Sequence, residues 1–303
     1  MEIGIVGLGR MGGSMAQRLL NAGHSVVVYD PVDKLVKTAV EYGAVGAASV
    51  NDMVKKLTEP RTVWIMVPPG SPTEDVINTL AVEMSRGDTI IDGGNSYYRD
   101  SIKRAEYLDT RGILFLDIGT SGGILGLEEG YCLMVGGDSK AYHRVEPIFQ
   151  TLAPEPDRGY GHVGPSGAGH FVKMVHNGIE YGLMEAYAEG FELMQAKQEF
   201  HLDLPRIAEI WRYGSVVRSR LLDLVAAALH GDPDLKGIEA YVEDSGEGRW
   251  TVQESMELAV PLPVISQSVQ RRFRSRQNQP FSSKLLAALR KQFGGHPVRK
   301  AGR

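Results

Sequence analysis

Short apolar runs alternate with longer amphipathic stretches through the first half of the chain. Runs of strand-like composition predict strands at 2–6, 25–29, 62–67, 89–92, 113–117 and 132–135. Apolar residues recur at helical spacing between several of these runs, as Met11, Met15 and Leu19 do after the first. Strands that alternate with helices predict a mainly parallel, doubly wound α/β sheet.

The alternation stops at Gly164. A glycine-rich loop over 164–169 leads into one long predicted helix that continues to about Lys197. Further helices are predicted at 205–213, 216–229, 251–260, 262–276 and 282–291. The pattern therefore predicts an α/β domain over 1–163 and an all-α domain over 164–303, with a long central helix and a basic tail from about residue 277.

Composition narrows the class of protein. The chain has 303 residues, 43% of them hydrophobic, which is enough for two packed domains and too many for a disordered chain. No apolar run approaches the roughly 18 residues of a membrane-spanning helix, and the chain opens without a basic stretch followed by an apolar one. The lone cysteine, Cys132, has no partner for a disulfide or a thiolate zinc site. We therefore expect a cytoplasmic protein whose fold rests on packing.

The charge is unevenly distributed along the chain. It carries 33 basic and 37 acidic residues, a formal charge of −4. Ten of the basic residues lie between Arg271 and Arg303, a stretch without Asp or Glu, so residues 1–270 carry a charge of −14. An acidic body with a basic arm is typical of proteins whose arm meets nucleic acid, a membrane or a small anion, and the charge alone does not choose between them.

A glycine-rich turn, Gly7-Leu8-Gly9-Arg10-Met11-Gly12, joins the first predicted strand to the first helix. In this pattern Gly7 allows a sharp turn, Gly9 lets the backbone approach a pyrophosphate, and Gly12 lets helix and strand pack closely. The anion then lies at the helix N-terminus, where unpaired N–H groups and the helix dipole favour it. Glycine turns also have purely structural uses, but the strand and helix around this one favour a Rossmann-like dinucleotide site.

An acidic residue at the end of the second predicted strand indicates which dinucleotide the site prefers, NAD or NADP. Asp30 lies eighteen residues after Gly12. A carboxylate in that place can accept hydrogen bonds from the adenosine ribose hydroxyls, and its charge repels the additional phosphate of NADP. NAD is therefore favoured over NADP. The alternative for Asp30 is an ordinary loop carboxylate.

Small and polar residues follow three of the predicted strands, at 68–70, 93–96 and 119–123. Ligands of doubly wound sheets bind beyond the carboxyl ends of the strands, and glycine there lets the backbone come close to a ligand. Three such segments in register favour a binding edge, whereas ordinary turns are the alternative for any one of them.

Five different functional groups form a stripe on the long predicted helix. They lie at positions i, i+3, i+4, i+7 and i+8: Lys173, His176, Asn177, Glu180 and Tyr181. The rest of that surface is apolar, which predicts that this part of the helix is buried. Taken singly, Lys173 and Glu180 are explained by surface ion pairs and His176 by a satisfied core histidine. Together, opposite a dinucleotide fold, they favour the wall of an active site.

The chain resembles the decarboxylating 6-phosphogluconate dehydrogenases, in their short-chain, NAD-preferring branch. The resemblance rests on Gly122-Gly123 after a strand, the run Lys173-Met174-Val175-His176-Asn177-Gly178-Ile179-Glu180-Tyr181, and the tail Arg290-Lys291-Gln292-Phe293-Gly294-Gly295-His296. The helix run is highly specific. The glycine turn is shared with all relatives in the β-hydroxyacid dehydrogenase superfamily, including the 3-hydroxyisobutyrate dehydrogenases.

The resemblance implies an oxidative decarboxylation. The family oxidises the C3 hydroxyl of 6-phosphogluconate, loses CO₂ from the 3-keto acid and protonates the resulting enediol to give ribulose 5-phosphate, without a metal. Lys173 matches the lysine that takes the hydroxyl proton and later returns it to the carbonyl, where it stabilises developing negative charge. Glu180 matches the acid that protonates C1. Two helical turns, about 10 Å, separate the two residues along the helix.

The resemblance also implies which residues bind substrate and cofactor. His176 and Asn177 complete the catalytic set with Lys173 and Glu180, and orient the substrate hydroxyls. The implied substrate-binding residues are Asn95, Ser121, Gly122, Gly123, Tyr181, Arg272, Arg290 and His296. The implied NAD-binding residues are Gly7, Leu8, Gly9, Met11, Gly12, Asp30, Val67 and Asn95.

The resemblance also implies a role for the basic C-terminal arm. Arg290 and His296 match residues that enter the active site of the partner subunit, which implies a homodimer or higher homo-oligomer with shared sites. A tail without carboxylates suits a phosphorylated sugar acid, so the small anion is favoured over nucleic acid or membrane. One departure concerns the phosphate: long-chain members carry an additional lysine in the loop that precedes Arg249-Trp250-Thr251, and the corresponding residues 244–248 contain none. Arg249 is the candidate replacement.

Two other functions remain open at this point. The first is a 3-hydroxyacid dehydrogenase of the 3-hydroxyisobutyrate type, which oxidises without decarboxylation and has no need of distant cations such as Arg272. The second is a non-catalytic dinucleotide sensor that meets nucleic acid or protein through the basic arm. A sensor has no need of Lys173 and Glu180 at working spacing.

Overall fold

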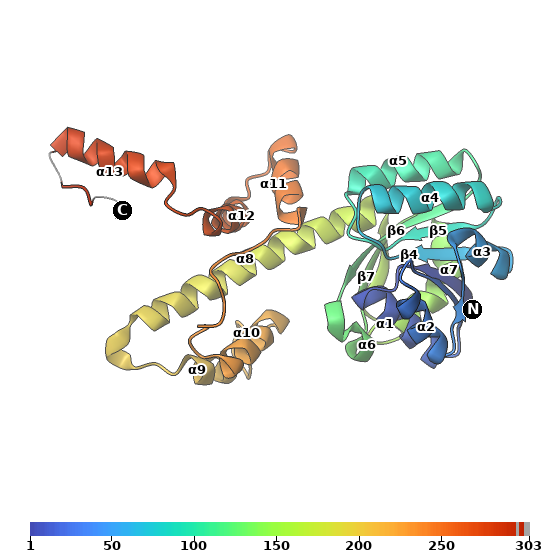
Figure 1. Ribbon diagram of the computed structural model, residues 1–303, viewed down its shortest axis with the longest axis horizontal. Helices are drawn as coiled ribbons and strands as arrows, with labels where there is room; N and C mark the ends of the chain where they lie inside the picture. Colours follow the sequence, from blue (N-terminus) through green and yellow to red (C-terminus); the bar gives the residue numbers. More distant parts are fainter. Residues whose placement is uncertain (295–296, 300–303) are drawn as a thin grey trace. The chain divides into compact units, whose positions relative to one another are not determined.

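The chain forms two units, which are described separately. The computed structural model describes residues 1–294 and 297–299, and its internal contacts group Met1–His176 into one unit and the chain from Asn177 onward into the other. The boundary falls inside helix α8 (Ala168–Ala196), which is 29 residues long (Figure 1). The division into domains 1–163 and 164–303, which follows the sequence pattern, stays a prediction.

The first unit is built on one sheet of eight strands. Their spatial order is β3, β2, β1, β4, β5, β6, β7, β8, and all neighbours are parallel except β6 and β7. The strands are β1 (Glu2–Val6), β2 (Ser25–Tyr29), β3 (Val45–Gly46), β4 (Thr62–Ile65), β5 (Thr89–Asp92), β6 (Leu114–Ser121), β7 (Cys132–Gly137) and β8 (Tyr160–Gly164). The strand order reverses between β1 and β4, where a doubly wound sheet opens a crevice at its carboxyl edge. The predicted fold class is confirmed.

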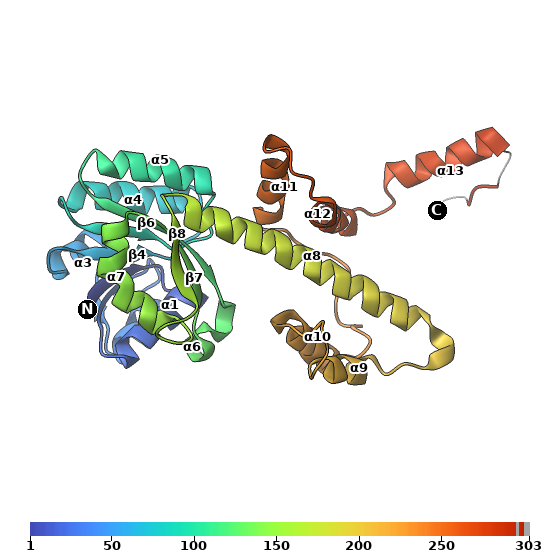
Figure 2. The same ribbon diagram turned by 180° about the vertical axis from the view of Figure 1, so that it is seen from behind.

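Helices cover both faces of this sheet. They are α1 (Arg10–Asn21), α2 (Asp33–Glu41), α3 (Val50–Lys56), α4 (Ser71–Glu83), α5 (Tyr98–Asp109), α6 (Gly126–Glu129) and α7 (Ser139–Leu152), with a 3₁₀ turn at Gly123–Leu125. Helices α1, α2 and α7 share one buried cluster with Trp64 of β4, whereas α3, α4 and α5 share a second with Val63 and Ile65 (Figure 2). Successive residues of β4 thus face opposite layers, as the period of a strand requires.

The second unit is helical. Beyond α8 it contains a 3₁₀ turn (Gln198–Phe200), α9 (Leu204–Trp211), α10 (Arg220–Gly231), α11 (Glu247–Glu257), α12 (Pro263–Ser275) and α13 (Phe281–Gly294). Phe191 of α8 packs with Ala208 of α9 and Leu222 of α10 in a separate buried cluster. Asp203 and Ser219 cap α9 and α10 by accepting N–H groups of their first turns, which is why these helices begin where they do. Among the described helices, none combines the length and apolar character needed to cross a membrane.

The structure departs from the sequence pattern in several places. Strands β3 and β8 are not among the predicted strands, and α11 begins at Glu247 rather than at 251. Strand β6 continues to Ser121, beyond the predicted end at 117, because it pairs with the antiparallel β7 along its whole second half. Helix α10 begins at Arg220 rather than at 216, since Ser219 caps it. The prediction that α8 is buried around its site residues is confirmed only in part: Met174 and Tyr181 are buried, whereas Ile179, Leu183 and Met184 are exposed among the residues that the structure describes.

Candidate active site

The glycine turn after β1 leaves room for a phosphate. The Gly7 N–H donates to the carbonyl of Tyr29, which ties the turn to β2. A Cβ at Gly12 would lie 2.0 Å from the Gly7 carbonyl oxygen, so only glycine lets α1 begin this close to β1. At Gly9, in contrast, a Cβ would meet nothing within 4 Å. The first turn of α1 holds no acidic residue, and no side chain caps it, so its N–H groups face an open cradle suited to a pyrophosphate.

Asp30 lies against this turn. Its carboxylate accepts the N–H of Leu8 at 2.8 Å and that of Val32 at 2.8 Å, and the residue is 9% exposed. Asp30 therefore fixes the turn and still reaches solvent at its edge. Met11 and Val67 are partly buried, the first in the cluster under α1 and the second in the cluster of the other face.

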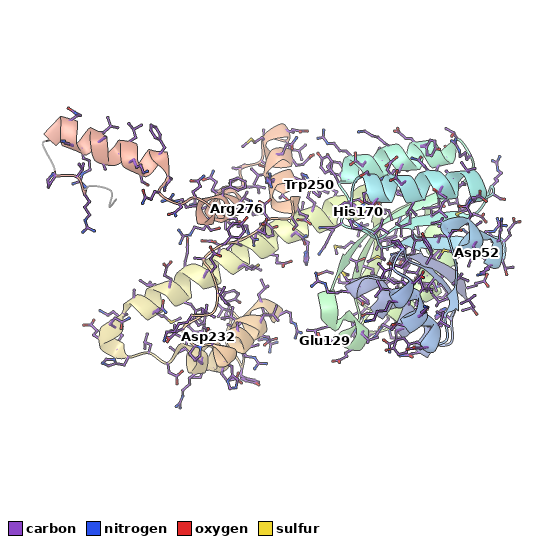
Figure 3. All side chains as sticks on the ribbon, in the orientation of Figure 1. Asp52, Glu129, His170, Asp232, Trp250 and Arg276 are labelled. Atoms are coloured by element: carbon purple, nitrogen blue, oxygen red, sulfur yellow. The ribbon has the colours of Figure 1, made fainter. Side chains whose placement is uncertain are left out.

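The first turns of α8 are held tightly against the sheet. Buried Asp117 of β6 accepts the N–H groups of Gly167 and His170, at 2.7 and 2.8 Å, and so caps the helix from a neighbouring strand (Figure 3 labels His170). A Cβ at Gly119 would lie 2.3 Å from the Cβ of Lys173 and 2.8 Å from the Gly169 carbonyl oxygen. The lysine that the sequence predicts as the catalytic base therefore lies directly over β6.

Polar groups at the end of β6 lie beside the same helix. The Ser121 hydroxyl lies 3.5 Å from Nε2 of His176, so the structure brings these two predicted site residues together. Gly122 has a φ of 135°, and a Cβ at Gly123 would meet nothing within 4 Å, which leaves the backbone there open to a ligand. Asn95 is half-buried in the loop after β5.

Cys132 opens β7 opposite Ser121 and is solvent exposed. Neighbouring protein atoms desolvate its thiolate and raise the pKa of the thiol, and the positive charge of Lys173 opposes that rise. The thiol is thus an electrostatic neighbour of Lys173. The sequence shows nothing of this relation, because 41 residues separate the two.

In the second unit, α8 carries Asn177 and Glu180 as half-buried residues and Tyr181 as a buried one. A Cβ at Gly178 would lie 2.9 Å from the Thr251 side chain, so glycine there lets α8 and α11 approach closely. The Arg272 guanidinium carbon lies 3.6 Å from the centroid of the Tyr181 ring. One Arg272 N–H donates to the carbonyl of Glu243 at 2.8 Å, which fixes the guanidinium over the ring.

A short chain of hydrogen bonds orients the hydroxyl of Tyr181. Its hydroxyl lies 3.3 Å from the Ser245 hydroxyl, which donates to buried Glu247 at 2.6 Å. A carboxylate only accepts, so the Ser245 proton points to Glu247. Sequence reasoning missed Ser245 and Glu247 because they lie 64 and 66 residues from Tyr181 and form no motif with it.

Arg249, the candidate replacement for the missing loop lysine, is bound to a neighbour. Its Nε donates to Asp244 at 2.7 Å, and Arg276 donates to the other oxygen of that carboxylate at 2.6 Å (Figure 3 labels Arg276). Burial opposes ionisation of Asp244, but the two guanidinium groups outweigh it and hold the pKa of the carboxyl below its ordinary value. Arg249 is thus engaged by Asp244, so its role as a replacement for the loop lysine stays a prediction.

The tail completes the inventory of predicted residues. Arg290 is exposed on α13, and His296 lies outside the described residues. No group of three or more His, Cys, Asp or Glu in the described part of the chain is placed to hold a metal ion.

Comparison with known proteins places this architecture in a family. Residues 2–164 match the model of the NAD binding domain of 6-phosphogluconate dehydrogenase, and 169–200 and 186–243 match that of its C-terminal domain. The chain belongs to the 6-phosphogluconate dehydrogenase family. It is 44% identical over 299 residues to the NAD(+)-dependent, decarboxylating 6-phosphogluconate dehydrogenase of Haloferax volcanii, covering 98% of each chain. It is 42% identical over 300 residues to YqeC of Bacillus subtilis, covering 99% of this chain and all of the relative.

Other family members are longer. The NAD(+)-dependent, decarboxylating enzyme of Bacillus subtilis is 35% identical over 287 residues, but the chain spans only 61% of its length. Among solved structures, 6-phosphogluconate dehydrogenase of Plasmodium falciparum superposes with a TM-score of 0.83 at 27% identity, covering 99% of this chain and 66% of the other. A 3-hydroxyisobutyrate dehydrogenase of Mycobacterium tuberculosis shares the fold, with a TM-score of 0.72 at 20% identity.

Proposed function

We propose that this protein catalyses the NAD-dependent oxidative decarboxylation of 6-phosphogluconate to ribulose 5-phosphate and CO₂. The observation that carries the proposal is helix α8, which bears Lys173, His176, Asn177, Glu180 and Tyr181 as one continuous helix in a chain of this family. A base, two hydroxyl ligands, an acid and a phosphate contact thus follow one another along the sequence of one helix. A six-carbon substrate is long enough to reach from the proposed base to the proposed acid, about 10 Å apart by the rise of a helix.

NAD is the proposed cofactor and accepts a hydride from C3 of the substrate. The open cradle over Gly9 and the uncapped start of α1 suit its pyrophosphate, and the carboxylate of Asp30 suits the ribose hydroxyls. The same carboxylate repels a 2′-phosphate, so we propose NAD over NADP. Leu8, Met11, Val67 and Asn95 are the further proposed contacts, and the reaction needs no metal.

Lys173 is the proposed base and acid. As a neutral amine it accepts the proton of the C3 hydroxyl while the hydride leaves C3, which gives a 3-keto acid and an ammonium group. The ammonium then returns the proton to the C3 oxygen while the C1–C2 bond breaks. The electron pair of that bond forms the C2–C3 double bond of an enediol, and CO₂ leaves. The capped and tightly packed start of α8 holds the lysine in place for both transfers.

Glu180 is the proposed acid of the last step. It donates a proton to the carbon that lost CO₂, which becomes C1 of ribulose 5-phosphate. Lys173, again a neutral amine, takes the proton of the hydroxyl on the former C3, which becomes the ketone. Ser121, Gly122 and Gly123 are proposed to receive the substrate carboxylate, and His176 and Asn177 the hydroxyls. The contact between Ser121 and His176 supports this assignment.

The phosphate is proposed to bind Tyr181 and Arg272, together with Arg290 and His296 of a second copy. We propose a homodimer or higher homo-oligomer with shared sites, located in the cytoplasm. The apolar side chains that the single chain leaves exposed on α8 and α13 support association; on α13 these include Phe281, Leu286 and Leu289. The charge of the tail suits a phosphorylated sugar acid rather than nucleic acid or membrane.

The test is turnover by the pure protein. With 6-phosphogluconate and NAD we expect NADH and CO₂ in equal amounts, and neither product from 3-hydroxyisobutyrate. If the protein binds NAD but forms neither NADH nor CO₂ from 6-phosphogluconate, the proposal is wrong. If it forms NADH without CO₂, it is a non-decarboxylating dehydrogenase.

A further inference from the structure

The loop that carries Asn95 is anchored on both sides of that residue. It joins β5 to α5 and begins with the N–H of Gly93, which donates to the carbonyl of Ile65 at 3.0 Å. Asp92, the last residue of β5, accepts the next N–H, that of Gly94, at 3.1 Å. On the other side of Asn95, the Ser96 hydroxyl accepts a hydrogen bond from Arg104 at 3.2 Å.

One guanidinium links the two anchors. Arg104, on α5, donates through the same nitrogen to Asp92 at 2.9 Å and to Ser96. Its Nε donates to Glu74 of α4 at 2.9 Å, and α4 and α5 lie side by side on one face of the sheet (Figures 1 and 2). The planar fork of an arginine can serve three acceptors in fixed directions, which an ammonium group on a flexible stem cannot do.

The ion pair lies where water cannot replace it. The side chain of Asp92 is fully buried and that of Arg104 is 3% exposed, whereas Glu74 is half exposed. Buried charges are retained only when they are paired and hydrogen-bonded, and they hold their neighbours in one geometry when they are. The carboxylate of Asp92 has one oxygen on Gly94 and the other on Arg104, so the loop and α5 share a single anchor.

We propose that Arg104 is a positioning residue of the active site, which acts through Asp92 and Ser96 to set the position of Asn95. The proposal rests on the proposed function, in which Asn95 contacts the cofactor, and on the resemblance to the family, which implies a contact with the substrate as well. The guanidinium touches neither of them. Its effect is to fix the five-residue loop 93–97 and thereby the position of Asn95. A displacement of about 1 Å at such a site lowers the rate about a hundredfold.

Two variants separate this role from general stability. Arg104→Lys keeps the charge that Asp92 needs but loses the fork, whereas Ser96→Ala leaves the ion pair whole and removes only the link to the loop. The matched control is Lys103→Met, which removes a cation from an exposed position of the same helix. We expect both variants to lower kcat/KM for 6-phosphogluconate by about tenfold to a hundredfold and to weaken NAD binding. The control should change neither.

The deciding measurement is a double-mutant cycle with Asn95→Ala. If Arg104 acts through Asn95, then Arg104→Lys has little further effect on kcat/KM in the Asn95→Ala background. Losses that multiply in that background, or an equal loss in Lys103→Met, would overturn the proposal. NAD affinity is measured in the same cycle, so the proposal stands or falls even if the wild-type protein does not turn over 6-phosphogluconate, an outcome that defeats only the proposed function.

Discussion

The Arg272 guanidinium lies over the ring of Tyr181, with 3.6 Å between the guanidinium carbon and the ring centroid. The two residues come from α12 and α8, 91 positions apart, and the Ser245–Glu247 chain holds the tyrosine from below. One Arg272 N–H is used by the Glu243 carbonyl, and a guanidinium carries further N–H donors of the kind that bind a phosphate. The relation joins two residues that the sequence could only propose separately.

Replacing Arg272 by Met should therefore act on the substrate rather than on the cofactor. A hydrogen-bonded contact with a charged group contributes about 1.5–3 kcal/mol, so the KM for 6-phosphogluconate should rise about tenfold to a hundredfold. The KM for NAD should stay the same. Arg274→Met, an exposed cation two positions further along α12, is the control, and steady-state kinetics with each substrate varied gives the answer. Equal changes in both KM values would remove Arg272 from the phosphate site.

The two acid–base residues of α8 should fail at different steps. Hydride transfer and loss of CO₂ precede protonation of the carbon that lost CO₂, so Glu180→Gln should form one equivalent of NADH in a rapid burst and then stall. Lys173→Met should show no burst, because the C3 hydroxyl keeps its proton. Rapid-mixing measurements of nicotinamide absorbance distinguish the two. Glu189→Gln, at an exposed position of the same helix, should behave like the wild type, and a missing burst in Glu180→Gln would contradict the assigned order.

Most of the fold was predictable because its determinants are local. The short apolar runs, the turn at 7–12 and the break at Gly164 are all patterns that extend over a few residues. The extension of β6 to Ser121 was not predictable from the sequence. Glycine and polar residues have a low strand propensity, and pairing with β7 completes the strand. The exposure of Ile179, Leu183 and Met184 on α8 was not predictable either. A sequence pattern shows that a helix surface is apolar, but it does not show which part of the chain or which partner covers that surface.

Some residues of the candidate site were likewise predictable from the sequence and others were not. Lys173, Glu180 and Tyr181 share one helix, so their spacing alone places them on one stripe. Arg104, in contrast, is one of several charged residues on α5, and only tertiary packing turns it toward Asp92. Glu247 and Ser245 likewise belong to no motif that the sequence shows. Their effect depends on where the first residue of α11 and the loop before it lie relative to Tyr181.

The packing of α8 on β6 predicts a sensitive glycine. In Gly119→Ala the new methyl group would lie 2.3 Å from the Cβ of Lys173, so α8 must shift away from the strand. Overpacking of this kind destabilises by about 1–3 kcal/mol, and the displaced lysine should also lower kcat. Gly161→Ala, in β8 where a Cβ would meet nothing within 4 Å, is the control. Denaturant unfolding and kcat are measured on both variants, and a fully active, fully stable Gly119→Ala would refute the tight contact.

Asp30 should control the choice of cofactor. Its carboxylate also holds the N–H of Leu8, so Asp30→Ala removes a structural acceptor together with the charge. Asp30→Asn keeps an acceptor and removes only the charge, and it should lower the affinity for NAD while raising the relative use of NADP. Exposed Asp33→Asn, in the first turn of α2, is the matched control. An unchanged ratio of kcat/KM for the two cofactors in Asp30→Asn would take the residue out of this role.

Cys132 offers a probe of the charge on Lys173. It is the chain's single cysteine, so alkylation by the neutral reagent iodoacetamide reports one site. Desolvation raises the pKa of the thiol and the Lys173 charge lowers it in part, so the rate of alkylation should reach half its maximum above the pH at which an unperturbed thiol does. In Lys173→Met the opposing charge is gone, so the midpoint should rise further and alkylation at a fixed lower pH should slow. A midpoint that falls, or stays the same, in Lys173→Met would show that the lysine at this site carries no charge felt by Cys132.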